Sequence, residues 1–361
     1  TGDVRIEFYA AIKTAEPFLP AGTVIAREQT YVHTFYKKEA TAQQPATSKE
    51  EGNLVAFSGP DFKATFDKQS GLLTSYLYKK HEYILNGQGP RPFFWRAPTD
   101  NDYGANLPVR LKAWKEASYQ EPKAESFQVT PGSNATTVKV TYRFPQTDAR
   151  WDITYKIYAS GVIKVDNRFM AEGDQAPMIP RVGLRMQLPE SFTDLTYYGR
   201  GPKENYRDRR TSQFIGEYAI PVKDMYEPYV RPQENNHRTD IYWCAFTDKT
   251  QRGLLLIADR TFELNASNYP LESMDSGDTI DNGAPRTEKT HHRHLTDPLP
   301  EKMVDLFIDY RMMGVGGDDS WGATAHEPYL IRPGKENAIE YGFTLVPFDK
   351  KEDYKYLIRQ Y

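Results

Sequence analysis

The amino-acid sequence predicts an all-β protein, a large antiparallel β-supersandwich preceded by a separate β-hairpin. The chain is rich in aromatic residues, with 25 Tyr, 18 Phe and 5 Trp, and such residues favour strands. Short runs of alternating apolar and polar residues recur along it, punctuated by turn formers drawn from 24 Gly and 25 Pro, which is typical of strands and hairpins. No βα alternation is long enough for a barrel of about 250 residues. No repeat marks a propeller.

The first part of the chain predicts a hairpin and a linker. Residues 4–12 and 23–36 alternate as two strands, so residues 1–36 form one hairpin. Residues 37–52 are polar and have little to bury, which indicates a linker. Because a lone hairpin is marginal in water, we expect residues 1–36 to be the last strands of a larger domain. The chain also opens abruptly at Thr1, which fits a cut inside a longer protein.

Residues 53–361 predict the sandwich itself. Helical periodicity is present only around 107–119, with a possible turn at 271–274. The expected strands are 54–57, 62–66, 72–78, 138–144, 151–158, 162–169, 181–188, 195–198, 242–247, 254–258, 262–266, 304–312 and 339–345. One antiparallel sandwich accommodates all of these strands most simply.

The net charge restricts the classes of partner that we expect, and the cysteine content indicates a buried thiol. Lys and Arg total 46 against 49 Asp and Glu, a net charge of −3, so we expect neither nucleic acid nor a membrane as a partner. No apolar run approaches the roughly 18–20 residues of a membrane helix. The single cysteine, Cys244, lies in an apolar run and is interpreted as a buried thiol. Nothing in the sequence indicates the compartment.

Two stretches predict functional loops. Residues 94–104 and 198–209, the latter continuing to 228–234, combine glycine, proline, charged residues and aromatic residues. Loops longer than about 12–15 residues in a compact domain tend to be functional. Glu204 and Asp208 lie among several arginines, so we interpret them as ion-paired structural carboxylates.

A glycine-rich stretch, residues 312–322, follows an expected strand. Its glycines permit backbone angles that other residues adopt at a cost, and Asp318 and Asp319 are typical of tight turns. Trp321 follows on the same loop, and two interpretations are open. The indole stacks on the apolar face of a sugar, or it plugs the end of the sandwich. The adjacent aspartates do not make a glycosidase pair, which needs two carboxyl groups about 5–10 Å apart across the bond.

Metal signals are weak. The run from His291 to His294 contains three histidines, but two histidines on one strand face without a third ligand make a poor zinc site. The oxygen-rich residues Asp100, Asn101 and Asp102 would permit a calcium ion. Neither pattern predicts a metal centre on its own.

Five motifs in order resemble the C-terminal module of glycoside hydrolase family 2 β-galactosidases. They are Arg96-Ala-Pro-Thr-Asp-Asn-Asp-Tyr-Gly104, Gly199-Arg-Gly-Pro-Lys-Glu-Asn-Tyr-Arg-Asp-Arg209, Met225-Tyr-Glu-Pro-Tyr-Val-Arg-Pro-Gln-Glu-Asn235, His292-Arg-His-Leu295 and Met313-Gly-Val-Gly-Gly-Asp-Asp-Ser-Trp321. The resemblance implies a galactose-mutarotase-like supersandwich for residues 53–361. Residues 4–36 similarly resemble the end of the immunoglobulin-like domain that precedes this module in the family.

The resemblance also implies a division of labour. Hydrolysis of terminal β-D-galactosides would use two glutamates, with magnesium and sodium, on an upstream barrel that this chain lacks, and the chain alone would be inactive and hold no cofactor. Trp321 would be the main sugar contact. Asp319, Gly104, Asp102 and His294 would be further substrate-binding residues, with a lid starting at Gly104. The partners would be the galactoside, the upstream domains and, in the full-length enzyme, other copies of itself.

Two alternatives remain open at this point. An aldose epimerase of the same fold would need an acid and a base facing each other across a cleft, and His294, His237 and Glu234 are the candidates. A stand-alone sugar-binding module is the other. An epimerase would accelerate the mutarotation of α-galactose, and a lectin would bind galactose or lactose with micromolar affinity.

Overall fold

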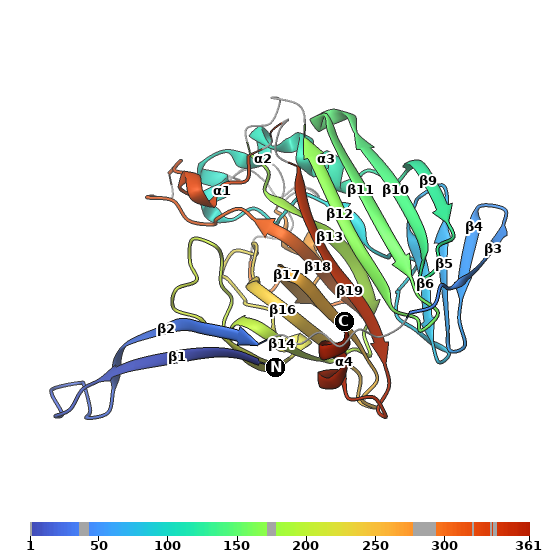
Figure 1. Cartoon of the computed structure of the whole chain (residues 1–361). Helices are drawn as coiled ribbons and strands as arrows, with labels where there is room; N and C mark the ends of the chain where they lie inside the picture. Colours follow the sequence, from blue (N-terminus) through green and yellow to red (C-terminus); the bar gives the residue numbers. More distant parts are fainter. Residues whose placement is uncertain are drawn as a thin grey trace. The chain divides into compact units, whose positions relative to one another are not determined.

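The computed structural model describes residues 2–35, 43–171, 178–276, 294–319, 321–332, 334 and 338–361. The chain divides into two compact units: residues 1–41 with 355–361, and residues 42–354. Antiparallel strands dominate both (Figure 1), so the all-β prediction is confirmed. No helix in the described part is long and apolar enough to cross a membrane.

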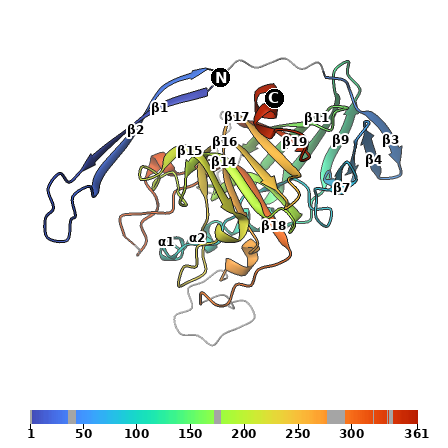
Figure 2. The same cartoon turned by 90° about the horizontal axis from the view of Figure 1, so that it is seen from below.

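The first unit contains the predicted hairpin. Strand β1 (Gly2–Ala11) pairs antiparallel with β2 (Val24–Phe35) along nearly its whole length, and Figure 2 shows the two strands side by side. Several of its apolar side chains are exposed, among them Ile6 and Phe8. The hairpin is confirmed, whereas its origin in an immunoglobulin-like domain stays a prediction. The chain ends in helix α4 (Tyr354–Gln360).

A small sheet begins the second unit. Its strands are β3 (Thr47–Glu51), β4 (Leu54–Ser58), β5 (Phe62–Asp67), β6 (Leu73–Tyr78) and β7 (His81–Glu82), paired in that order. The predicted linker, residues 37–52, is therefore wrong from Thr47 onward, where β3 pairs with β4. The side chains of β3 are all exposed. Charged side chains on an edge strand prevent the strand from pairing with another chain. Such a polar run resembles a linker in the sequence.

A larger sheet of 12 strands, counted over the described residues, forms the rest of the unit. Strand β17 pairs with β19 through residues 253–258 and with β18 through residues 263–267, so it changes partner in between. Strands β8, β9 and β15 were missed by the sequence analysis, and the strands expected at 254–258 and 262–266 are the single strand β17. The strands are β8 (Arg91–Phe93), β9 (Ala124–Thr130), β10 (Thr136–Phe144), β11 (Ala149–Ile157), β12 (Ile163–Ala171), β13 (Arg181–Pro189), β14 (Asp194–Gly201), β15 (Phe214–Pro221), β16 (Arg238–Thr247), β17 (Gly253–Ser267), β18 (Met303–Met312) and β19 (Ile339–Phe348).

Helices are few and short. The helix predicted around 107–119 is confirmed as α2 (Leu107–Arg110) and α3 (Lys112–Tyr119), and the turn predicted at 271–274 is a 3-10 helix. Helix α1 (Asp100–Gly104) lies where coil was expected. The other 3-10 turns are η1 (Pro145–Thr147), η2 (Val222–Asp224) and η5 (Glu327–Tyr329).

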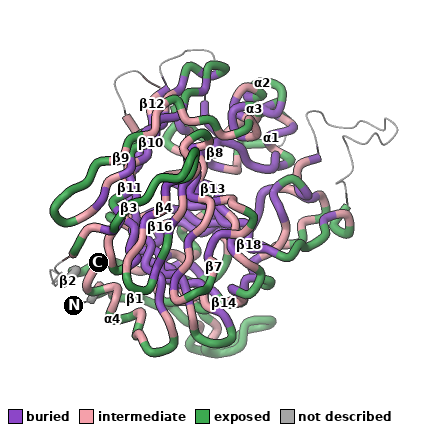
Figure 3. Tube along the Cα trace, turned by 90° about the vertical axis from the view of Figure 1, so that its right-hand side faces the viewer, coloured by how far each residue is buried: buried purple, intermediate pink, exposed green. Residues whose placement is uncertain are grey.

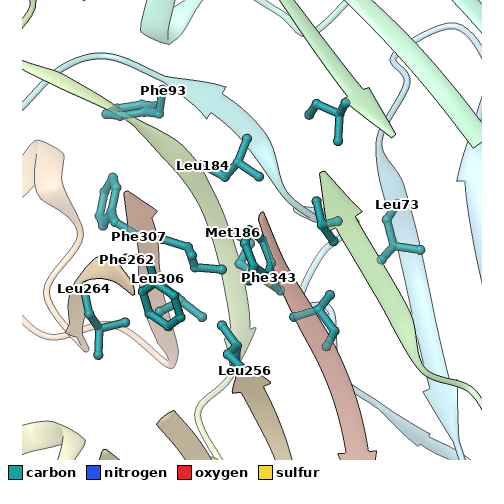
Figure 4. Packing of buried hydrophobic residues seen from close by; sticks show 14 of the residues in the cluster. Leu73, Phe93, Leu184, Met186, Leu256, Phe262, Leu264, Leu306, Phe307 and Phe343 are labelled. Carbon is teal, nitrogen blue, oxygen red and sulfur yellow. The ribbon is translucent and has the colours of Figure 1, made fainter. Parts of the chain in front are cut away.

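The core of the second unit is apolar and aromatic. Buried residues are concentrated in the central strands, whereas the edge strand β3 and the loop tips are exposed (Figure 3). Leu184 and Met186 of β13 lie beside Leu306 of β18 (Figure 4), and all three are buried. Cys244 is also fully buried, as predicted. Burial of this kind is the main stabilising term in folding.

Candidate functional site

The glycine-rich loop leaves the end of β18 and is held by backbone hydrogen bonds. Met313 N donates to Pro180 O at 3.0 Å, and Gly314 N donates to Tyr329 O at 2.8 Å. A Cβ on Gly314 would lie 2.5 Å from Asp208 Oδ2 and 2.8 Å from Ala325 Cβ. Glycine is needed at 314 because two other segments pack directly against its Cα.

Arg96 ties the first motif to this loop. Its guanidinium donates to both carboxylate oxygens of Asp102, at 2.9 and 2.7 Å. It also donates to Met313 O at 2.7 Å and Gly314 O at 3.1 Å. Arg96 and Asp102 are both buried. Their pair is bidentate, the geometry that makes an arginine–carboxylate contact strong and directional.

Asp208, from the second motif, holds the next turn of the loop. Its carboxylate accepts from Val315 N at 3.2 Å and from Gly316 N at 2.7 Å. The prediction that Asp208 is ion-paired is therefore wrong, because its recorded partners are backbone amides. The same prediction is confirmed for Glu204, which binds Arg209 at 2.7 Å.

Asp319 fixes the tip of the loop. Its Oδ1 accepts from Trp321 N at 2.8 Å, Gly322 N at 3.2 Å and Ala323 N at 3.3 Å. The amides of Trp321 and Ala323, followed by Gly322, lower the pKa of this carboxyl because they bind its charged form. Asp319 is thus a turn former, as the sequence predicted.

Trp321 projects from this turn with 87% of its surface exposed. It does not plug the end of the sandwich. Tryptophan side chains are mostly buried on average, so an indole exposed to this extent is unusual on a protein surface. The neighbouring Asp318 binds His326 at 2.8 Å.

Gly104 lies next to the same tip. A Cβ built on Gly322 would be 3.7 Å from Gly104 O. Asn101 Nδ2, one turn earlier in α1, donates to Val315 O at 3.1 Å. The third motif joins this cluster through Glu234 N, which donates to Ala97 O at 3.2 Å. Four of the five motifs therefore meet around the loop that carries Trp321.

The remaining predicted site residues lie in different settings. Asp102 is buried, and besides Arg96 it accepts from Thr99 N at 3.0 Å in the capping box of α1. His294 is exposed, and its backbone N donates to Asp297. Sugar contact by Asp102, His294, Asp319 or Gly104 stays a prediction. His291 and His292 lie outside the described residues.

The possible calcium site gains no support from these contacts. Both oxygens of Asp102 are used by Arg96, and Asn101 donates through its amide to Val315. Asp100 faces Gln233 instead, at 3.0 Å. Among the described residues, no group of three or more His, Cys, Asp or Glu side chains could hold a metal ion.

Two of the three epimerase candidates, His237 and Glu234, lie in a buried polar cluster, whereas His294 is exposed. His237 contacts Asn265 at 2.6 Å and Glu263 at 3.0 Å, and Glu234 accepts from Asn265 at 2.7 Å. Burial lowers the pKa of His237, but the hydrogen bond and charge of Glu263 outweigh burial and raise it. His237 and Glu234 are both buried, so they do not face each other across an open cleft.

The comparison with protein families decides what this chain is. The model of the beta galactosidase small chain family matches residues 58–345. The chain belongs to the beta galactosidase small chain family. The match contains all five motifs and most of the second unit.

Curated relatives of this small chain are named beta-galactosidases. The protein from Priestia megaterium is 33% identical over 291 residues, covering 80% of this chain and 26% of the relative. That from Streptococcus thermophilus is 28% identical and covers 90% of this chain and 30% of the relative. The chain thus spans about a quarter to a third of the length of these relatives.

Solved structures with some likeness to this chain include a putative mutarotase and a galactose 1-epimerase. A putative mutarotase from Salmonella typhimurium matches with a TM-score of 0.45 and 10% identity, over 87% of this chain and 97% of that one. The galactose 1-epimerase from Lactobacillus acidophilus matches with a TM-score of 0.40 and 6% identity, over 86% and 99%.

Proposed function

We propose that this chain is the non-catalytic part of a β-galactosidase and that Trp321 contacts the galactoside. The observation that carries the proposal is the exposed indole on a loop whose base is fixed by Arg96 and Asp208. A rigid platform loses little entropy when it binds. Membership of the small-chain family adds support.

The magnitude suits a binding role. Half-burying an indole against a sugar removes about 80–120 Å² of apolar surface, worth roughly 2–3 kcal/mol at about 25 cal/mol per Å². That corresponds to roughly 30- to 150-fold in affinity. Glycosidase rate enhancements need far more than this and need two carboxyl groups.

We assign the chemistry to the part of the polypeptide outside this chain. Two glutamates on an upstream barrel would act as acid and nucleophile, with magnesium and sodium bound there. The carboxylates nearest Trp321 in sequence serve other purposes, because Asp319 caps a turn and Asp318 binds His326. Asp102, Gly104, Asp319 and His294 are weaker proposals for direct sugar contact.

The test uses the full-length enzyme. Replacing Trp321 with Ala should raise KM for a β-galactoside by about one to two decades, and Trp321→Phe should recover part of the loss. Phe18→Ala is the matched control, since Phe18 is a fully exposed aromatic residue that lies outside the five motifs. An unchanged KM in the Trp321→Ala enzyme would remove the proposed contact.

A second measurement tests the assignment of catalysis to another domain, independently of the contact between Trp321 and the galactoside. The 361-residue chain alone is incubated with a chromogenic β-galactoside and should release no aglycone above the buffer rate. Hydrolysis by the chain alone, lost on denaturation, would contradict the assignment of catalysis to another domain.

A further inference from the structure

A large polar cavity lies in the second unit, apart from the Trp321 loop. Its volume is about 910 Å³, at the upper end of the roughly 300–1,000 Å³ of small-molecule sites. Side chains from β10, β11, β12, β16, β17, β18 and β19, together with Arg207 and Arg210, line it. Figure 1 shows β10, β11, β12 and β19 as neighbouring strands. Neither Trp321 nor Gly104 is among the lining residues.

Every carboxylate that lines the cavity already has a cationic partner. Asp166 pairs with Lys156 at 3.2 Å and Asp259 pairs with Lys164 at 2.6 Å, so each has a cation of its own. The other four pairs are Asp152 with Arg150 at 3.0 Å, Asp240 with Arg210 at 3.0 Å, Glu263 with Arg207 at 3.4 Å and Glu340 with Arg168 at 3.2 Å. The negative charge of the lining is therefore neutralised within the protein.

Three lining cations are not neutralised in this way. Lys139, Arg260 and Arg311 have no side-chain hydrogen bond or ion pair with any residue that the structure describes. Lys139 projects from β10, and Arg260 lies where β17 changes partner. The guanidinium of Arg311 is 4.8 Å from the ring centroid of Tyr310. Cations facing one cavity without counter-charges attract an anionic ligand.

The buried polar cluster behind the cavity does not supply the missing negative charge. It contains Arg181 and His237 together with Glu234 and Asp309, two basic and two acidic groups. Arg181 Nε lies 3.2 Å from Asp309 Oδ2 and its NH2 group 3.4 Å from Glu234. The excess of positive charge thus belongs to the three lining cations.

Two aromatic rings and an amide complete the lining. The rings of Tyr310 and Tyr341 have centroids 6.1 Å apart, and both residues are half-buried. Asn167 accepts from Trp151 Nε1 at 3.0 Å, while its own Nδ2 has no partner among the described residues. Aromatic faces suit the apolar faces of sugar rings. Unused donors suit a ligand rich in acceptors.

We propose that this cavity binds an acidic oligosaccharide, one whose sugar units carry sulfate or carboxylate groups. The unpartnered cations select the anionic groups, and the tyrosines select the sugar rings. The volume favours several sugar units over one. This site is separate from the Trp321 contact, so either proposal stands without the other.

Calorimetry with the whole chain tests the proposal. The probes are a sulfated galactotetraose, a tetragalacturonate and neutral galactotetraose, each titrated at low and moderate salt. We expect at least one acidic probe to bind about tenfold or more tightly than the neutral one, and its affinity to fall as salt rises. Whichever acidic probe binds more tightly identifies sulfate or carboxylate as the anionic group.

Charge-neutralising variants locate the site. Lys139→Gln, Arg260→Gln and Arg311→Gln should each weaken binding of the acidic probe by about 3- to 10-fold, the loss of one charge-assisted contact near the surface. Lys123→Gln is the matched control, since Lys123 is exposed and does not line the cavity. Melting temperatures show that each variant is folded.

Four results would contradict the proposal. One is the absence of binding by both acidic probes at millimolar concentration, and another is equal binding of the neutral probe. The third is an equal loss of affinity in the control and cavity variants. Inorganic sulfate that binds as tightly as the sulfated probe would also contradict the assignment to a saccharide.

Discussion

The glycine-rich loop and the charged cavity use polar side chains in opposite ways. At the base of the loop, Arg96 has a donor bond to each of four acceptors, and Asp208 accepts from two amides. In the cavity, Arg260 and Arg311 have no side-chain bond to a described residue. The polar side chains at the base of the loop hold the segment that carries Trp321, whereas these cavity cations are available to bind a ligand. A buried, fully bonded charge contributes to structure, and an unbonded exposed one is free to bind a ligand.

A pair of arginine substitutions tests this comparison with the largest expected difference in stability. Arg96→Ala leaves the buried Asp102 carboxylate without its cationic partner and removes the Arg96 donor from two carbonyl oxygens, so we expect it to lower the free energy of unfolding by about 3–5 kcal/mol. Arg260→Ala removes an exposed side chain and should cost less than about 0.5 kcal/mol. Urea unfolding measures both, and equal losses would contradict the comparison.

A pair of aspartate substitutions gives a smaller contrast. Asp208→Ala removes the acceptor of Val315 N and Gly316 N, and we expect a loss of about 1–3 kcal/mol. Asp259→Ala removes an exposed partner of Lys164 and should cost about 0–1 kcal/mol. In the full-length enzyme Asp208→Ala should also raise KM, because Trp321 would lose its fixed base. An Asp208→Ala protein as stable as Asp259→Ala would argue against this role.

The buried cluster behind the cavity predicts a pH effect. Burial raises the pKa of Asp309 to about 7, with Arg181 opposing the shift. The folded chain therefore keeps a proton that the unfolded chain releases near its ordinary pKa of about 4. This stabilisation is complete below about pH 4 and is lost as the pH rises towards 7, with a slope of at most about 1.4 kcal/mol per pH unit.

Asp309→Asn isolates that contribution, because an amide of the same shape does not titrate. Relative to this variant, the wild-type chain should become less stable between about pH 4 and 7. Other groups in contact with the cluster, such as His237, titrate in both proteins, so the difference between the two curves is the quantity to measure. Parallel curves of unfolding free energy against pH would show that Asp309 has no raised pKa.

The smallest expected effect is at the loop tip. Trp321→Ala should change the free energy of unfolding by less than about 0.5 kcal/mol, since the indole is 87% exposed. Trp151→Ala, which removes a fully buried indole, should cost about 3–5 kcal/mol. Thermal unfolding compares the two. A large loss at Trp321 would mean that the indole serves the fold rather than a ligand.

Local patterns predicted most of the strands, since alternation records which face is buried. The approach failed at β3, where the polar run 47–51 pairs as an edge strand. It also failed at β15, which it left inside a long loop. In both places the neighbouring strand, and not the local sequence, decides the structure.

The loop site was predicted in part. Trp321 was found because glycine, aspartate and tryptophan lie together in sequence, and the turn made by Asp319 follows from its residue type. The role of Arg96 was missed because the carbonyl oxygens it binds lie 217 and 218 residues away. The capping box between Thr99 and Asp102 can be inferred from the local Thr-x-x-Asp pattern, but that pattern says nothing about Arg96.

The cavity was not predicted at all. Lys139 alternates with apolar residues and looks like part of a solvated strand face, and Arg260 lies in a polar run between two expected strands, 254–258 and 262–266. Only the curvature of the sheet and the pairing of each carboxylate distinguish a binding surface from such a face. Neither the curvature of the sheet nor the pairing of the carboxylates can be predicted from the sequence of a single segment.

The close packing around Gly314 restricts which residues this family can have at position 314. The carboxylate of Asp208 fills the space that a methyl group at 314 would need, 2.5 Å from the Cβ position. Positions 208 and 314 are therefore sterically coupled: alanine at 314 requires a smaller residue at 208 and also a shift of Ala325, whose Cβ lies 2.8 Å from the same position. The two sites should coevolve, although 106 residues separate them.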